Sequence, residues 1–162
     1  MAADESKVIR IVERIRQVQA YVDGVISKLP EEIDKKYGYM HLYGVSQACA
    51  LLAMKRKQNV DLATIAGLLH DIYTYKNQAM TDHAHRGAEL AKEILSSLNV
   101  FTNEEINTIS QAIYHHSDKA DVDSSFDEVL KDADVLQHGL YNPLADVAEH
   151  EKERFEKLTR EL

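Results

Sequence analysis

The residues best suited to chemistry are histidines and aspartates, and the most informative are the adjacent pair His70-Asp71. This pair closes the apolar run from Leu62 to Leu69, so an imidazole and a carboxylate would emerge together from the end of a buried segment. Nitrogen and oxygen donors of this kind suit Mn, Fe, Co, Ni, Zn or Mg. Further candidate ligands lie upstream and downstream: His41, His83, His115, His116 and Asp134. The pattern predicts a divalent-metal site assembled from distant parts of the chain.

Each candidate also has a purely structural explanation when it is taken alone. A single histidine on an apolar helix face, such as His41, is more often a hydrogen-bonded core residue. The pair His115-His116 could be a polar helix end favoured by the helix macrodipole. Burying so many unpaired polar groups on apolar faces would be costly without a metal, however. Taken together, the candidates favour metal binding.

Helical periodicity dominates the elements that must position these residues, and we find no alternating strand pattern, internal repeat or low-complexity linker. We therefore predict an all-α helical bundle that forms one domain over residues 1–162. Asp61 is the expected N-cap of the helix that leads to His70, residues 76–81 read as a polar turn, and Thr102–Glu105 form a capping box. The expected helices are a long one ending near Pro30, then 39–57, 61–70, 82–98, 102–116, one from 125, and a last one after Pro143.

Helical phase ranks the histidines within two clusters. His83 aligns with Gly87 and the apolar residues that follow it, whereas His85 aligns with charged residues, so we expect His83 to face inward and His85 outward. His116 continues the apolar stripe of its helix, and His115 is displaced from it by about 100°. His116 is therefore favoured, although both could bind at a fraying helix end.

Composition limits the other possibilities. The chain has 162 residues, enough for one sizeable core, and a net charge of −8 that argues against an extended nucleic-acid surface or an anionic membrane partner. Residues 1–7 carry acidic groups and no apolar signal region, and no later apolar stretch reaches membrane-spanning length. The single cysteine, Cys49, cannot form an internal disulfide. We expect a cytoplasmic protein.

The order His41, His70-Asp71, His83, His115-His116, Asp134 resembles the H…HD…H…HH…D pattern of the HD-domain metal-dependent phosphohydrolase superfamily. The resemblance covers about residues 38–142 and includes the local contexts at 67–71, 83–90, 112–117 and 131–136. Periodicity does not choose between Asp132 and Asp134. The family's closing Ala-Asp motif selects Asp134.

The resemblance implies an HD-type helical fold that holds one or two divalent metal ions. His41, His70, Asp71 and Asp134 match the family's minimal single-metal set. His83, His115 and His116 match the additional histidines of branches with two metals. The two-metal assignment is therefore an expectation from the family.

The implied activity is hydrolysis of a small phosphate ester, nucleotide or pyrophosphate by metal-activated water, with no protein nucleophile. Lys76, Arg86 and Lys119 lie near the motif segments and could bind phosphate charge. Two family branches fit poorly. Gly-Tyr-Pro, the signature of cyclic-dinucleotide phosphodiesterases, is missing after His116, and residues 72–74 lack the carboxylate that single-metal enzymes often place after the HD pair.

Two other functions remain open. The same seven residues resemble the ligands of HD-type di-iron oxygenases, which would oxidise a substrate with oxygen. A non-catalytic, metal-retaining nucleotide-binding module is also possible, since the amphipathic helices at both ends could bind a partner. These end helices could equally cap the core or form a homodimer.

Overall fold

The computed structural model describes residues 2–162, with side chains from residue 9 onward, so Met1 of the predicted domain lies outside the described residues. Within this described part the regular elements are all helical, which confirms the predicted all-α class. The elements are α1 (Ala2–Ile26), α2 (Glu32–Lys55), α3 (Val60–Leu69), α4 (Ile72–Asn77), α5 (His83–Leu98), α6 (Asn103–His115), α7 (Ser125–Tyr141), the short 3-10 helix η1 (Glu149–Glu151) and α8 (Lys152–Glu161).

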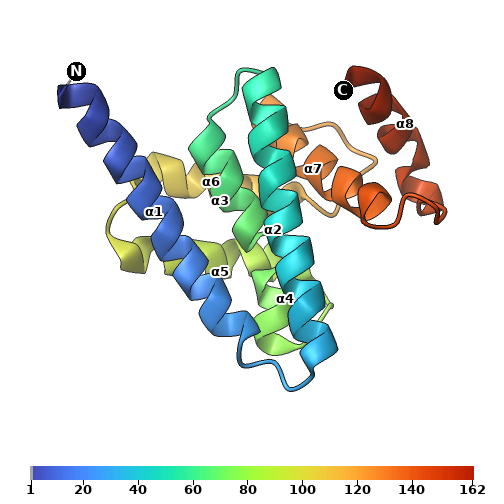
Figure 1. The fold of residues 1–162 in the computed structure, drawn as a ribbon, viewed down its shortest axis with the longest axis horizontal. Coiled ribbons are helices and arrows are strands. Elements are labelled where there is room, and N and C mark those ends of the chain that lie inside the picture. The colour runs from blue at the N-terminus through green and yellow to red at the C-terminus, as the bar shows by residue number, and fades with distance from the viewer. Residues whose placement is uncertain (1) are drawn as a thin grey trace.

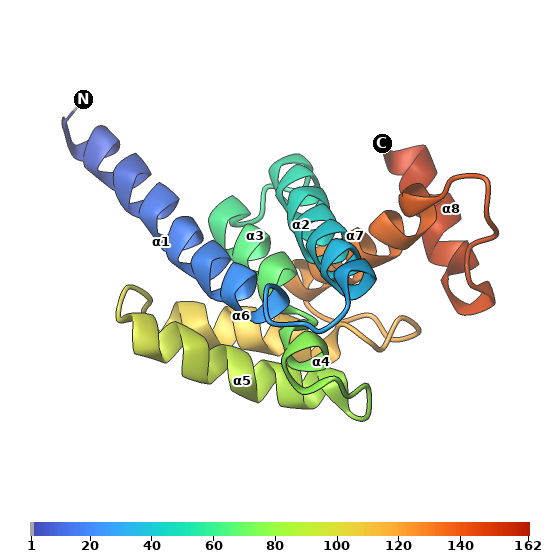
Figure 2. The ribbon, with the colours of Figure 1, turned by 60° about the horizontal axis from the view of Figure 1, so that its bottom comes forward.

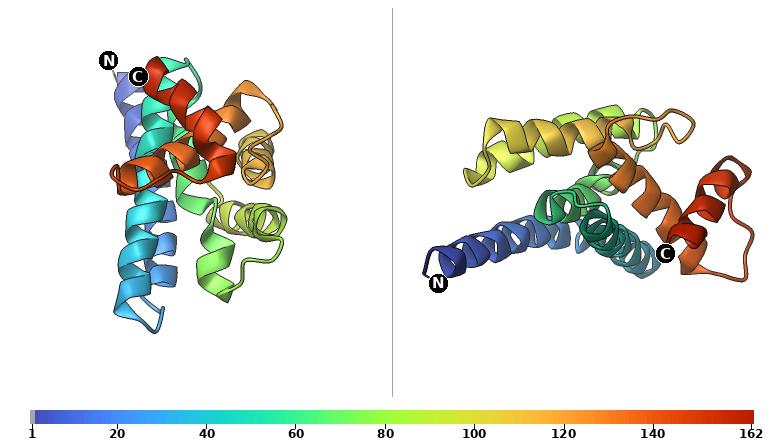
Figure 3. Two further views of the ribbon diagram at one scale, coloured as in Figure 1. Left: turned by 90° about the vertical axis from the view of Figure 1, so that its right-hand side faces the viewer. Right: turned by 90° about the horizontal axis from the view of Figure 1, so that it is seen from above.

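Helix α3 lies at the centre of the bundle, where it contacts α1, α2, α6 and α7 (Figure 1). Helices α5 and α6 pack side by side and cross beneath α1 and α3 (Figure 2). Seen from above, α7 runs from α6 past α2 toward α8, which lies at the opposite side from the N-terminus (Figure 3). This central position explains why α3 is almost entirely apolar. It also brings the end of α3, at His70, close to α2, α7 and the end of α6.

One glycine allows α2 and α3 to approach closely. A Cβ atom added to Gly67 would lie 2.6 Å from the backbone Cα of Ser46, which is closer than real Cβ contacts. The Ser46 hydroxyl also donates a 2.9 Å hydrogen bond to the carbonyl of Thr64. The two helices thus pack backbone to backbone next to His70.

Several predicted helix ends are confirmed. Thr102 and Glu105 form the predicted capping box at the start of α6. Asn99 ends α5 in the left-handed conformation, with φ of 54°. These ends depend on contacts within a few residues, which local sequence specifies well.

Three other predicted boundaries of helices and turns were wrong. The N-cap of α3 is Asn59, whose side chain accepts from the Leu62 amide, because Asp61 instead forms a 2.6 Å ion pair with Arg14. Helix α2 begins at Glu32, before the predicted residue 39. The expected polar turn at 76–81 starts too early, since Lys76 still belongs to the short helix α4.

The last helix begins later than predicted. Residues 142–148 form a loop in which Leu144 is 96% exposed, and α8 starts only at Lys152. Ion pairs hold α8 in place: Arg154 binds Asp132, and Glu161 binds Arg56, each at 2.6 Å. No helix in the described part of the chain is both long and apolar enough to span a membrane.

Candidate metal centre

The first group of candidate ligands gathers around the end of α3. His41 from α2 and His70 face each other with their Nε2 atoms 3.0 Å apart. Asp71 Oδ2 lies 3.3 Å from His41 Nε2, and Asp134 Oδ1 from α7 lies 3.6 Å from His70 Nε2. Three helices that are separate in sequence therefore direct two imidazoles and two carboxylates toward one another.

The second group shares Asp71 with the first. Asp71 Oδ1 lies 3.4 Å from Nε2 of His83, at the start of α5, and 3.4 Å from Nε2 of His116, at the end of α6. The remaining oxygen of the same carboxylate faces His41. Asp71 thus directs one carboxylate oxygen at each group.

Hydrogen bonds at Nδ1 fix the orientation of the histidine rings, whose Nε2 atoms face the centre. Nδ1 of His70 donates to the Gly67 carbonyl at 2.8 Å, and Nδ1 of His116 donates to the Ile113 carbonyl at 2.6 Å. His83 Nδ1 lies 3.1 Å from the Met80 carbonyl, and His41 Nδ1 lies 2.9 Å from the side-chain oxygen of Gln137. A carbonyl oxygen accepts only from a protonated nitrogen, so the neutral rings keep their Nε2 lone pairs toward the centre.

This donor set fits a metal. The Nε2 lone pairs and carboxylate oxygens that face one another all accept, so a cation among them would satisfy them together. Oδ1 of Asp71 and Oδ1 of Asp134 are buried and have no hydrogen-bond partner among the described residues. With metal–ligand bonds of about 2.1 Å, two ligands of one ion are about 3.0–4.2 Å apart. The observed 3.0–3.7 Å separations match, so both groups could hold a divalent ion.

Charge around the centre keeps both carboxylates ionised. Burial alone would raise the pKa of Asp134, but the nearby Lys119 ammonium and His70 hold it well below its usual range. Burial also opposes ionisation of Asp71, but the neighbouring imidazoles of His70 and His116 hold its pKa well below its usual range. For His116 itself, burial prevails and lowers the pKa, which favours the neutral ring that a metal requires.

The structure brings six of the seven predicted metal residues into these two groups and leaves out His115. Its Nδ1 lies 2.9 Å from Asp127 Oδ2, in a separate cluster with Asp123. His116, the next residue, is buried and faces the centre. The pair sits at the end of α6, where the two rings point to different sides.

The structure also places the two neighbouring residues, His85 and Asp132, that were not chosen as ligands outside the centre. His85 points outward and pairs with Asp82 at 2.7 Å, as its helical phase predicts. Asp132 binds Arg56 and Arg154 instead of entering the centre. Sequence reasoning missed His138, whose Nε2 lies 3.4 Å from Asp134 Oδ1. Its spacing of four residues from Asp134 on α7 was the available signal.

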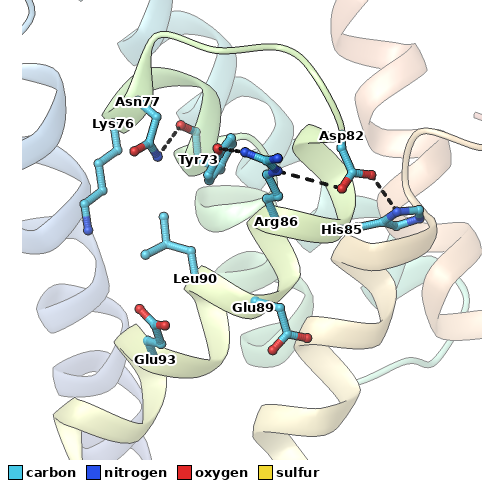
Figure 4. A pocket seen from close by; sticks show the side chains of 9 residues that line it. All are labelled: Tyr73, Lys76, Asn77, Asp82, His85, Arg86, Glu89, Leu90 and Glu93. Atoms are coloured by element: carbon cyan, nitrogen blue, oxygen red, sulfur yellow. Dashed lines mark hydrogen bonds and ion pairs between the residues drawn. The ribbon is translucent and has the colours of Figure 1, made fainter.

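The predicted phosphate-binding residues are placed in two different ways. Lys119 is largely buried and donates a 2.6 Å hydrogen bond to Asp134 Oδ2, so it supports a candidate ligand. Lys76 and Arg86 line an open pocket of about 450 Å³ on α4 and α5 (Figure 4). Arg86 donates to the Tyr73 hydroxyl at 2.8 Å there. No metal-ligand candidate lines this pocket, but in its wall Tyr73 lies two residues after Asp71 and Asp82 directly precedes His83.

Comparison with known proteins assigns the family. The HD domain family model matches residues 38–139, well over half of the chain, and the match includes all the candidate ligands described above. No curated protein and no solved structure matches the chain. The HD family consists mostly of metal-dependent phosphohydrolases, and its members bind divalent metals through histidine and aspartate residues. The family model covers six residues that gather at one centre, and the chain belongs to the HD domain family.

Proposed function

We propose that this protein is a metal-dependent phosphohydrolase that acts on a small phosphate ester, a nucleotide or pyrophosphate. The observation that carries the proposal is the position of Asp71, with one carboxylate oxygen directed at His41 and the other at His83 and His116. A shared carboxylate would keep two metal ions close enough to act on one phosphate group. The proposed ligands are the six predicted residues that the structure brings together, without His115: His41, His70, Asp71, His83, His116 and Asp134.

The net charge expected for a metal-loaded centre supports an anionic substrate. Two divalent cations against Asp71 and Asp134 leave about two positive charges, which phosphate oxygens would neutralise. When bound, the metal would polarise the phosphoryl group and lower the pKa of a coordinated water. Lys119 already pairs with Asp134, so it fixes that carboxylate and leaves Oδ1 facing the centre.

Exposure indicates the side from which the substrate would approach. His70 and His116 are fully buried and form the floor of the centre, whereas Asp71 and His83 remain partly exposed. Three residues after His83, Arg86 is exposed next to the pocket described above. Arg86 and Lys76 are thus the residues that we propose attract phosphate toward the His83 side.

The test is phosphate release from a panel of phosphate esters, nucleotides and pyrophosphate by protein purified without chelator, with Mn, Co, Ni, Mg or Fe added. We expect release that requires metal, stops with chelator and is lost in folded His70→Ala. Oxygen-dependent oxidation by iron-loaded protein without phosphate release would overturn the proposal in favour of an oxygenase. Tight nucleotide binding without turnover would do so in favour of a binding module.

A further inference from the structure

His138 lies at the edge of the metal centre on α7, four residues after Asp134. Its Nε2 is 3.4 Å from Asp134 Oδ1, the carboxylate oxygen that has no hydrogen-bond partner among the described residues. Its ring stacks on the His41 ring, with centroids 5.3 Å apart and planes at 8°. His138, His41 and Asp134 each offer a ligand atom, and these three atoms lie within 4.8 Å of one another.

Glu151 holds His138 in this orientation. Nδ1 of His138 donates to both carboxylate oxygens of Glu151, at 3.1 and 3.2 Å. Glu151 comes from η1 and is only 4% exposed, and a carboxylate is costly to bury without a partner. Since this hydrogen bond uses Nδ1, the lone pair of the neutral ring lies on Nε2 and faces Asp134.

We propose that His138 is an additional protein ligand of the metal ion held by His41 and Asp134, and that Glu151 positions it. A carboxylate that binds the far nitrogen of a ligating histidine is a recurrent arrangement at metal sites, because it fixes the ring and raises its basicity. The 3.4 Å separation from Asp134 Oδ1 falls within the range of two ligands on one ion.

The proposal gives the C-terminal segment a role in the centre. The family match ends at residue 139, so η1 and α8 lie beyond it, yet η1 supplies Glu151. Arg154 of α8 fastens the same segment to α7 through Asp132. The inference rests on the proposed metal centre and is independent of the reaction carried out there.

The chain offers matched controls for both residues. His150 is 74% exposed and only 4.0 Å from Glu151, and Glu149 is an exposed neighbour that pairs with Lys152. His150 and Glu149 carry the same kinds of group as His138 and Glu151, and both lie on η1 beside Glu151. A general loss of charge near η1 would therefore affect the controls as well.

The experiment titrates Co²⁺ into the metal-free full-length chain and follows both affinity and the visible absorption of the bound ion. We expect His138→Ala to bind Co²⁺ at least about tenfold more weakly than the wild type and to show an altered absorption spectrum. Glu151→Gln should bind Co²⁺ about tenfold more weakly than the wild type. His150→Ala and Glu149→Gln should match the wild type. Circular dichroism checks the fold, and His138→Gln replaces the alanine variant if that variant is unfolded.

Each other result counts against the proposal. Wild-type Co²⁺ affinity and spectrum in a folded His138 variant would overturn the proposal while leaving the metal centre intact. Equal losses in the His138 and His150 variants would overturn it as well, because they would indicate a general electrostatic effect. A wild-type chain that binds no Co²⁺ at all would overturn both this inference and the proposed function.

Discussion

Gly67 and His70 connect helix packing to ligand geometry. The Gly67 carbonyl accepts a 2.8 Å hydrogen bond from His70 Nδ1, while the missing side chain of Gly67 lets α3 lie against the Ser46 backbone of α2. The same residue therefore fixes the ring of one candidate ligand and the spacing of the two central helices. A change there should affect stability and metal binding together.

Gly67→Ala should destabilise the protein by about 1–3 kcal/mol, because the new methyl group meets backbone that cannot move aside easily. Gly24→Ala is the control, since nothing lies within 4 Å of a Cβ at that position of α1. There the change should be neutral or stabilise by about 0.5–1 kcal/mol. Urea unfolding in the presence of chelator measures both. Equal stability of the two variants would refute the close-packing argument.

His83 and His85 provide a contrast within one helix turn. His83 faces Asp71, so His83→Ala should lower the number of metal ions per chain and the rate of phosphate release. His85 pairs with Asp82 on the outer face, so His85→Ala should keep the wild-type metal content. Metal analysis of both purified variants tests this. Loss of metal only in the His85 variant would mean that the helical phase is wrong.

Metal affinity should depend on pH through His41. Burial favours its neutral form, but the carboxylates of Asp71 and Asp134 outweigh burial and raise its pKa. A metal binds the neutral ring, so it must displace a proton that His41 keeps to a higher pH than a free imidazole would. Mn²⁺ affinity should therefore fall as pH drops through the pKa of His41 and level off above it. Calorimetry in buffers of different ionisation enthalpy should detect released protons, and constant affinity between about pH 6 and 8 would contradict this.

Cys49 should report on metal-linked stability. The thiol is completely buried, and burial raises its pKa, so it should react with a thiol reagent only when the core opens. Metal ions that bind α2, α3 and α7 together stabilise the folded state by mass action. Added Mn²⁺ should slow labelling of the wild type, and chelator should restore the faster rate. In His70→Ala the rate should not respond to metal; a full response there would show that the ion binds elsewhere.

The sequence predicted those features that depend on local pattern. The apolar run before His70-Asp71 gave the central helix, the phase of His83 gave its inward direction, and Thr102 gave the start of α6. Each of these follows from residues within a few turns of one helix. The choice of Asp134 over Asp132 came from the family motif, because helical phase alone left both open.

The features that the sequence did not predict depend on contacts between residues that are distant in sequence. His115 and Asp127 are separated by the loop after α6, and only the folded loop shows that they pair with each other. His138 became a candidate once η1 placed Glu151 behind its ring. Asp61 lost the predicted capping role because Arg14, on α1, pairs with it. In each case the role of the residue depends on a partner from another element, which helical periodicity cannot indicate.

The most direct test of the metal centre is the metal content of Asp71→Asn, because Asp71 alone among the described residues has an oxygen in each group. Protein purified without chelator, reloaded with Mn²⁺ and freed of excess ion is measured by elemental analysis, with Asp34→Asn as an exposed control on α2. About two ions per chain are expected in the wild type and the control, and nearly none in folded Asp71→Asn. Undiminished metal in folded Asp71→Asn would contradict the proposed role of Asp71.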